Sequence, residues 1–512
     1  MEIEQNTSKF QPWLRNAFVS SDKAFGEFSR KLSQYAIPGD ADFLFNKIFS
    51  RSYAWLDSLS GRESATSFGA QEHTLKAFQK TLGFLETQGV ISGVRLDRPR
   101  YNDAPAFTEL DIIPAYPLGT TDGRVLDKAF GHGFGKDVTA VFSKAIGEFL
   151  ERYFLTLYRK KNLIRASSNS LARKGRSFLD PRLLSVPSEK QAELYPEQRW
   201  NEESVLSWEK AERVSTGDGE YVPAQLVYWN FILDNEEPRL AEFNTNGAGG
   251  MFTKEGAILS GLYELIQRDA FLIYWLNCIA PQRVDPETVP NDAFRSLYQE
   301  SRRYGFAVYC LNITADTGVP SFVVAISDES GKSPRFSLGG GCQADPVKAL
   351  HRALEEAWSA YYWVRPRPPY NLPESYQPFS DRTIGQGERL RLWANPQMAE
   401  NFLFFLAGAK KHFSEFSFNF PDSFSSEKEE LKFLTKKVED LGRGYEVYYY
   451  LVRHPILSRL GYCSARVIVP QLISLYLNET RAPFDAKRLR EVPHKLGLEA
   501  AKELCPYPHP FP

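Results

Sequence analysis

The chain has 512 residues, which is enough for two to four domains with large packed cores. Apolar residues make up 43% of it and charged residues 24%, which is typical of a globular, water-soluble protein. A net charge of -1 excludes the strong basic field that binders of nucleic acid and anionic membranes use, so we expect neither partner. No apolar run approaches the roughly 18 residues of a membrane-spanning helix.

The N-terminal residues and the cysteines bear on the cellular compartment. The segment MEIEQNTSKF has neither the basic nor the apolar part of a signal peptide. The five cysteines are scattered and include no CxxC pair, which argues against a disulfide framework or a structural zinc site. We therefore expect a cytoplasmic protein.

The first part of the chain is predicted to be helical. FQPWLRNAFVSSDKAFGEFSRKL and DFLFNKIFSRSYAWLDSL both carry apolar residues at three- and four-residue spacing. The pattern then changes to short strand-like runs. We therefore predict a helical N-terminal extension over residues 1–78 and a main domain over residues 79–512.

The main domain is predicted to be mixed α/β (α+β). Strand-like runs such as FAVYCLNITA, SFVVAIS, YEVYYYLV and ARVIVPQLISLYL alternate with long amphipathic helices. Three proline-rich or polar stretches interrupt the ordered parts, and periodic segments resume on both sides of each. We interpret these stretches as surface insertions rather than linkers.

Three predicted helices carry acidic residues on an apolar framework, at residues 140–153, 257–271 and 348–362. The first two share an internal echo, in which Glu-x-x-Glu or Glu-x-x-Gln is followed by Arg. Such pairs are usually solvated salt bridges on a helix surface. The alternative is that the three helices converge and direct carboxylates inward, an arrangement that suits Mg²⁺ and nucleotide phosphates.

The common nucleotide-binding motifs are absent. GHGFGKD at residues 131–137 resembles a P-loop only superficially, because Phe130 replaces the first glycine and Asp137 replaces the serine or threonine. NTNGAGG at 244–250 is rich in glycine but is no dinucleotide fingerprint. The residues alone therefore indicate an α/β protein with clustered acidic helices and glycine turns, and they leave open whether the acidic pairs are surface salt bridges or bind Mg²⁺ and phosphate.

The last residues, CPYPHPFP, have proline at every second position. Prolines remove backbone donors and fix φ, so this tail is predicted to be an extended, polyproline-like segment. Most chain ends are frayed and polar. This one carries Tyr507, His509 and Phe511, which favours a binding partner within the protein.

Three motifs and this tail resemble the YcaO family. The motifs are GFGKDVTAVFSKAIGEFLERY, NTNGAGGMFTKEGAILSGLYELIQRDAF and GGGCQADPVKALHRALEEA, in the family's order, and PHPFP resembles the tail of azoline-forming members. The resemblance covers about residues 80–512. It implies a YcaO-type fold with an internal pseudo-repeat, in which acidic helices flank β-sheets.

The resemblance also implies an activity. Such enzymes bind ATP and Mg²⁺ and convert Cys, Ser or Thr of a precursor peptide to thiazoline or oxazoline by phosphorylating the backbone amide oxygen. The implied metal ligands are Glu148, Glu151, Glu264 and Glu356. The implied cofactor-binding residues are Lys136, Ser143, Arg152, Asn246, Arg268 and Arg352. The implied catalytic tail residues are Pro508, Pro510 and Pro512, with the Pro512 carboxylate as a base or an orienting group.

Several positions depart from the family pattern. Lys144 stands where the family has serine, with Ser143 beside it, and Gln267 replaces the second glutamate of the central motif. A neutral amide is a weaker ligand for a hard cation than a carboxylate is. Further departures lie at Asp137, Phe252, Gly256, Ser359 and Tyr361.

The expected partners are an E1-like leader-binding protein and a ribosomally made precursor peptide. A flavin-dependent azoline dehydrogenase is an optional further partner, and we expect a homodimer within the complex. Two alternatives remain open at this point. The altered site is also compatible with a non-catalytic scaffold, or with a YcaO enzyme that makes thioamides or amidines.

Overall fold

The computed structural model describes residues 65–97, 101–115, 118–119, 125–126 and 131–511, apart from 235, 331–333, 381–382, 419 and 422. The chain divides into two compact units, Met1–Gly89 and Val90–Pro512. In the first unit the structure describes helix α5 (Ala65–Thr87). The other predicted N-terminal helices lie outside the described residues. The predicted boundary after residue 78 falls within α5 and stays a prediction.

The second unit contains three main sheets, whose paired strands are antiparallel except for β10 and β14. The first has the order β1 (Ile91–Asp97), β2 (Thr108–Pro114), β5 (Gly131–Gly135). The second has the order β13 (Phe336–Cys342), β12 (Ser321–Asp328), β11 (Phe306–Asn312), β10 (Gln282–Val284), β14 (Lys410–Lys411). The third has the order β6 (Ile164–Ala166), β7 (Leu206–Arg213), β15 (Tyr448–Leu451), β16 (Cys463–Ile468), β9 (Ala248–Met251), with β8 (Gly219–Pro223) on β7. A small ribbon pairs β3 (Leu118–Gly119) with β4 (Val125–Leu126).

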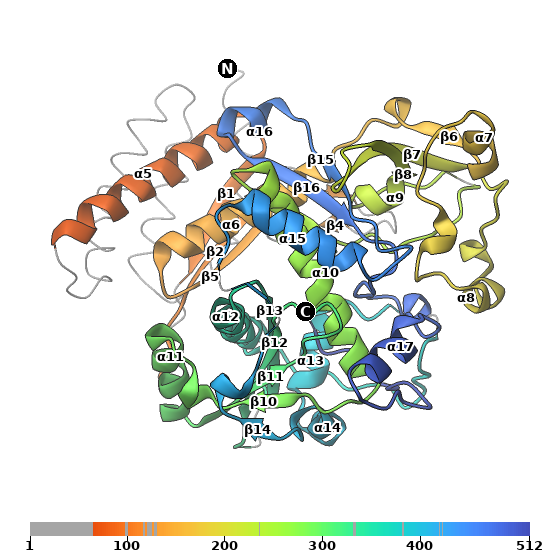
Figure 1. Ribbon diagram of the computed structural model, residues 1–512. Helices are drawn as coiled ribbons and strands as arrows, with labels where there is room; N and C mark the ends of the chain where they lie inside the picture. The colour runs from red at the N-terminus through yellow and green to blue at the C-terminus, as the bar shows by residue number, and fades with distance from the viewer. Residues whose placement is uncertain are drawn as a thin grey trace. The chain divides into compact units, whose positions relative to one another are not determined.

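Helices surround these sheets (Figure 1). They are α6 (Val138–Phe154), α7 (Ser168–Arg173), α8 (Glu189–Leu194), α9 (Ala224–Val227), α10 (Lys254–Leu276), α11 (Asp292–Arg303), α12 (Pro346–Val364), α13 (Gln386–Ala394), α14 (Leu403–Leu406), α15 (Glu427–Glu439), α16 (Pro455–Leu460) and α17 (Arg488–Lys495). The predicted mixed α/β fold class is confirmed.

Strand β12 shows how the five-stranded sheet is covered on both faces. Its apolar residues alternate between two cores, because successive side chains of a strand point to opposite faces. Phe322, Val324 and Ile326 belong to a cluster that includes the buried face of α12. Val323 and Ala325 belong to a second cluster with the C-terminal half of α10 and with α13. A strand that is buried on both faces carries apolar side chains at consecutive positions, as the sequence SFVVAIS does.

Three strand–helix units repeat through the fold: β5 with α6, β9 with α10, and β13 with α12. In each unit a glycine-rich strand lies directly against the helix that follows it. A Cβ atom added to Gly133, Gly249 or Gly341 would overlap the carbonyl oxygen of Val141, Ala257 or Ala349. Each helix begins at a side-chain cap, which Asp137, Thr253 and Asp345 provide. The echo seen in the sequence is therefore part of a threefold structural repeat.

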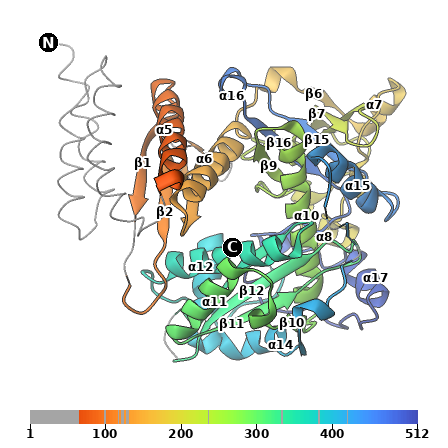
Figure 2. The same cartoon turned by 60° about the vertical axis from the view of Figure 1, so that its left-hand side comes forward.

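Helix α10 belongs to two cores. Residues 257–266 pack with β15, β16 and α15, while residues 270–276 pack with β12, β13 and α13. The helix thus runs from the six-stranded sheet to the five-stranded sheet (Figure 1, Figure 2). Eighteen of its 23 residues are buried. A helix buried on most of its surface is expected at such a central position.

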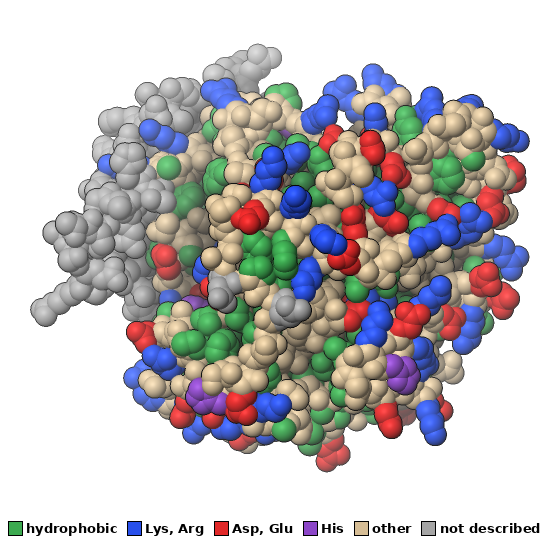
Figure 3. Space-filling view, viewed as in Figure 1, with side chains coloured by type: hydrophobic (Ala, Val, Ile, Leu, Met, Phe, Trp, Pro, Cys, Tyr) green, Lys and Arg blue, Asp and Glu red, His purple; other side chains and the backbone are tan. Residues whose placement is uncertain are grey.

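Basic and acidic side chains are interspersed over the face drawn in Figure 3, in line with the net charge of -1. In the part of the chain that the structure describes, no helix is both long enough and apolar enough to cross a membrane.

We expect Gly341→Ala and Gly133→Ala to lower the midpoint of thermal unfolding. An added Cβ would meet the carbonyl oxygen of Ala349 or Val141, and forcing an extra carbon into such packing costs about 1–3 kcal/mol. Gly93→Ala is the matched control, because no neighbouring atom lies within 4 Å of its added Cβ. Equal melting temperatures for Gly341→Ala and Gly93→Ala would show that the strand–helix contact is looser than described.

Candidate active site

Three glutamates, one in each strand–helix unit, accept a hydrogen bond from the backbone. Glu148 Oε2 accepts from the His132 amide of β5. Glu264 Oε2 accepts from the amide of Gly247, next to β9, at 2.7 Å. Glu356 Oε2 accepts from the Gly340 amide of β13, also at 2.7 Å. We call these three residues the capping glutamates, since each ties its helix back to the preceding strand.

Arginines bind the capping glutamates on the same helices. The Arg152 guanidinium lies 2.5 Å from Glu148 Oε1, and the Arg268 guanidinium lies 2.6 Å from Glu264 Oε1, each at i,i+4 spacing. Arg268 also donates to Asn246 Oδ1. The structure therefore brings Asn246, Arg268 and Glu264 together, as the motifs predicted.

The charges of the three helices act on one another. Burial, followed by the negative charge of Glu264, raises the pKa of Glu151 to about 8. Burial raises the pKa of Glu356 as well, although Arg352, the Gly340 amide and Arg268 oppose this shift. Carboxylates on α6, α10 and α12 are thus close enough to influence each other's ionisation. The three helices therefore converge, which the acidic pattern left open beside the alternative of solvated surface salt bridges.

The residue three positions after the capping glutamate differs between the units. It is Glu151 on α6, Gln267 on α10 and Ser359 on α12. The Gln267 amide lies against Gly340, because a Cβ on that glycine would overlap it. Ser359 Oγ lies 3.2 Å from His132 Nε2. We call these residues the variable positions, since the three units carry a carboxylate, an amide and a hydroxyl there.

The donor set fits Mg²⁺ bound together with phosphate. Among the described residues, no cluster of three or more acidic, His or Cys side chains is arranged to hold a metal ion by itself. Mg²⁺ usually takes one or two carboxylates and completes its shell with water and phosphate oxygens. Burial, with a contribution from neighbouring negative charge, raises the pKa of Glu151 and Glu356, and a bound cation would favour the ionised form of these carboxyls, which is a hard oxygen ligand.

Two partly buried guanidinium groups each have one buried donor that is unused. The Nε atoms of Arg152 and Arg268 have no hydrogen-bond partner among the described residues. Arg466 of β16 donates to the Leu226 and Asn244 carbonyls, and burial lowers its pKa to about 10, opposed by the charge of Glu264. These arginines supply positive charge beside the glutamates, which suits an anionic ligand.

The other three predicted cofactor-binding residues, Lys136, Ser143 and Arg352, are exposed. Lys136 pairs with Glu300 of α11 rather than with the glutamates. Lys144 donates to the Phe134 carbonyl at 3.2 Å and to Glu355 at 2.7 Å, so it links α6 to α12.

The motifs missed a polar group beside Glu148. His132 Nδ1 lies 2.8 Å from Asp111 Oδ1, and Asp111 also pairs with Arg95. Burial disfavours the imidazolium, but the hydrogen bond that His132 donates to Asp111 and the nearby negative charges raise the pKa of His132 overall. Burial also raises the pKa of Glu109 to about 7. Only the pairing of β2 with β5 brings these residues together, and GHGFG alone gave no signal of it.

The tail is buried within this unit. The Cys505 amide donates to the Leu276 carbonyl at 2.7 Å, and Phe511 is 2% exposed. A Cβ on Gly340 would overlap the ring of Phe511, so the tail reaches the strand whose amide binds Glu356. Residues 505–511 are therefore not a frayed end. Pro508 and Pro510 lie along this path, and Pro512 lies outside the described residues.

Solved structures with this fold are heterocyclases and a related YcaO protein. A heterocyclase in complex with substrate and cofactor has 22% sequence identity and a TM-score of 0.68, covering 86% of this chain and 57% of its own. YcaO from Methanopyrus kandleri, bound with AMPPCP and Mg²⁺, has 16% identity and a TM-score of 0.56, covering 80% of this chain and 93% of its own. These similarities define the fold class, and this chain spans little more than half the length of that heterocyclase.

The chain belongs to the YcaO cyclodehydratase family. The family model, described as ATP- and Mg²⁺-binding, matches residues 132–473. An uncharacterised protein of Methanothermobacter thermautotrophicus is 28% identical over 285 residues, which are 55% of this chain and 67% of that protein. Membership of this family confirms the resemblance seen in the motifs. It also confirms the predicted cofactors, ATP and Mg²⁺.

We expect the tail to undock at low pH. His509 is buried, and its Nε2 donates to the Tyr476 carbonyl at 2.7 Å. Burial, together with the positive charges of Arg389 and Arg268, lowers the pKa of His509 well below the usual value of about 6.5. A proton therefore binds better to the undocked tail. The free energy of docking is therefore independent of pH above about 6.5 and becomes steadily less favourable as the pH falls from there towards the lower pKa of docked His509.

The measurement is the ¹⁹F resonance of 4-fluorophenylalanine at position 511, followed from about pH 8 to about pH 5.5. His509→Gln is the control, because its amide still donates a hydrogen bond but does not titrate in this range. A resonance of the parent chain that stays unchanged over the range would contradict the prediction.

Proposed function

We propose that the protein is an ATP-dependent cyclodehydratase that forms thiazoline or oxazoline rings from Cys, Ser or Thr of a precursor peptide. The main observation in support is that glutamates and arginines from α6, α10 and α12 converge next to the buried tail. Glutamates supply hard oxygen ligands, and arginines with unused Nε donors supply phosphate contacts.

The proposal assigns a role to each group of residues. The metal ligands are Glu148, Glu151, Glu264 and Glu356. The nucleotide contacts are Lys136, Ser143, Arg152, Asn246, Arg268 and Arg352. For Lys136 this role requires its ion pair with Glu300 to open. ATP supplies the phosphoryl group that turns the amide oxygen of the peptide into a leaving group.

The chain's own residues bind and orient in this scheme. The capping glutamates hold one carboxylate oxygen on a backbone amide, which fixes where the other oxygen lies. Arg152 and Arg268 hold the phosphates at a set distance from those oxygens. The tail, through Pro508, Pro510 and Pro512, is the catalytic arm, which contacts the peptide where the thiol or hydroxyl attacks.

We further propose that a separate E1-like protein binds the leader of the precursor peptide. In support, this chain spans 57% of the heterocyclase that it resembles, so that protein contains much that this one does not match. A flavin-dependent azoline dehydrogenase and a second copy of this chain would complete the complex.

Mixing this chain with the E1-like protein, precursor peptide, ATP and Mg²⁺ tests the function by mass spectrometry. We expect loss of one water for each ring and release of one ADP and one phosphate. Extending the chain beyond Pro512 by a few residues should abolish ring formation while ATP binding persists. An unmodified peptide with no ATP consumed would instead favour the scaffold, which the neutral Gln267 also suits. Replacement of oxygen by sulfur, or an amidine, would favour the other alternative.

Glu264→Gln should weaken binding of Mg·ATP and abolish ring formation. Its helix already carries a neutral Gln267, so the substitution leaves α10 without a carboxylate at the two positions that face the site. Isothermal titration calorimetry measures the affinity, and Glu189→Gln, on the exposed first turn of α8, is the control. Unchanged affinity in both Glu264→Gln and Glu148→Gln would remove the metal assignment.

A further inference from the structure

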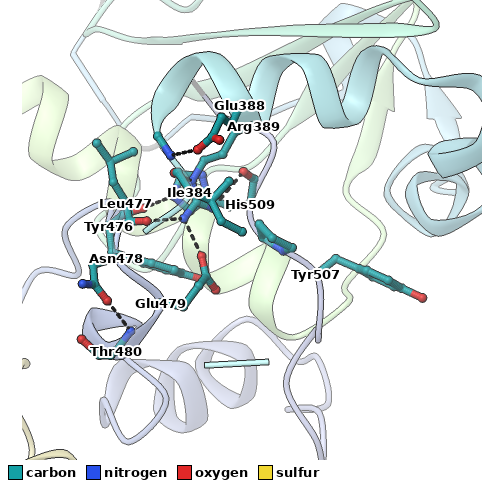
Figure 4. A network of polar contacts seen from close by, with 12 residues as sticks. Ile384, Glu388, Arg389, Tyr476, Leu477, Asn478, Glu479, Thr480, Tyr507 and His509 are labelled. Atoms are coloured by element: carbon teal, nitrogen blue, oxygen red, sulfur yellow. Dashed lines mark hydrogen bonds and ion pairs between the residues drawn. The ribbon is translucent and has the colours of Figure 1, made fainter. Parts of the chain in front are cut away.

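Arg389 of α13 is fully buried and joins three separate segments (Figure 4). Its Nε donates to the Ile384 carbonyl at 2.9 Å. Its Nη2 donates to the Leu477 carbonyl at 3.2 Å and forms an ion pair of 2.6 Å with Glu479, whose side chain is also buried. Its Nη1 donates to the His509 carbonyl of the tail at 3.3 Å. One guanidinium thus connects the start of α13, the 477–479 segment and the tail.

Side-chain donors bind three consecutive carbonyls of the tail. Trp275 Nε1 donates to the Tyr507 carbonyl at 3.3 Å, and Trp393 Nε1 donates to the Pro508 carbonyl at 3.1 Å. Arg389 binds the next carbonyl in the chain, that of His509. Arg389 and Trp393 lie one turn apart on α13, so they share a face of that helix. The tail is therefore held residue by residue.

The sequence of the tail explains why donors from other side chains are needed to hold it in place. Proline has no N–H, so a segment with proline at every second position has few donors of its own. It cannot fix its register as an ordinary strand does, by alternating donors and acceptors. Donors from neighbouring side chains replace that ladder and specify which carbonyl lies where.

The chemistry of Arg389 suits this task better than that of an apolar residue or a lysine. A planar guanidinium presents donors in fixed directions, whereas an ammonium is a point charge on a flexible stem. Burying the pair with Glu479 costs desolvation, and a buried ion pair of this kind is weak evidence for stability. Its hydrogen bonds to three segments instead indicate a role in specifying geometry.

The end of the tail lies at the candidate active site. Phe511 packs on Phe271 with ring centroids 4.8 Å apart, and it lies against Gly340 beside Gln267. Gly340 is the residue whose amide binds Glu356. A slip of the tail by one residue would replace this aromatic ring by proline at the site.

We propose that Arg389, held by Glu479, is a positioning residue that sets the register of the tail in the active site. The inference rests on the proposed function insofar as the tail takes part in ring formation. Docking of the tail itself does not depend on that function. The two are therefore measured separately.

The first experiment measures docking without substrate. The probe is the ¹⁹F resonance of 4-fluorophenylalanine at position 511. The variants are Trp393→Phe, which removes one tail hydrogen bond, and Arg389→Met combined with Glu479→Gln, which removes both buried charges and avoids leaving one unpaired. We expect a second resonance at the free position in both variants, dominant in the double variant. Loss of one such hydrogen bond corresponds to about a tenfold shift in the docking equilibrium.

Trp208→Phe is the matched control for docking. Trp208 is equally buried and donates one hydrogen bond, to the Ala166 carbonyl at 2.9 Å, in a core that excludes the tail. This variant should give the docked resonance alone. A single docked resonance in the double variant as well would overturn the proposal.

The second experiment measures ring formation by the same variants in the complete complex. We expect the double variant to retain Mg·ATP binding and the KM for peptide but to lose at least about 100-fold in kcat, since misplacement of a catalytic group by about 1 Å has such an effect. Arg389→Lys should recover part of the loss. Equal losses in kcat and in Mg·ATP binding would indicate a merely structural role. If the parent chain forms no rings while docking behaves as expected, the proposed function fails and the positioning of the tail stands.

Discussion

The fold depends on the direct contact between a glycine-rich strand and the helix that follows it. At Gly133, Gly249 and Gly341 the missing side chain lets the helix backbone approach the strand, and a methyl group would meet a carbonyl oxygen. This separation lets a glutamate side chain on the helix reach the backbone amide of its own strand, as Glu264 reaches Gly247. The same strand–helix contact occurs three times, and it positions both the core residues and the capping glutamates.

Helix α10 connects this local contact to the rest of the molecule. Its first half belongs to the core of the six-stranded sheet and its second half to the core that contains Phe511. Glu264 and Arg268 lie between the two halves. The tail bonds to the end of the same helix, since the Cys505 amide binds the Leu276 carbonyl. Packing of the tail and placement of the carboxylates are therefore properties of one structural element.

The sequence predicted what depends on local pattern. Helix periodicity placed Glu148, Glu264 and Glu356 on long helices, and the resemblance to the YcaO family implied that they are metal ligands. It did not locate His132 with Asp111, because their contact requires the pairing of β2 with β5. It missed Arg389 entirely, since its partners are 90 and 120 residues away in the chain. Lys136 was assigned to phosphate by motif alone, and its nearest charged partner, Glu300, comes from another helix.

The difference between the capping glutamates and the variable positions has a consequence for how such a site can change. Each capping glutamate is bound to the backbone of its own unit, so replacing it would loosen a helix. Glu151, Gln267 and Ser359 have no such tie to the preceding strand in the described hydrogen bonds, and they already span a carboxylate, an amide and a hydroxyl. The capping glutamates thus hold the scaffold together, while the residues at the variable positions set the charge of the site. A chain built this way can acquire a new ligand preference one helix at a time while its architecture stays intact.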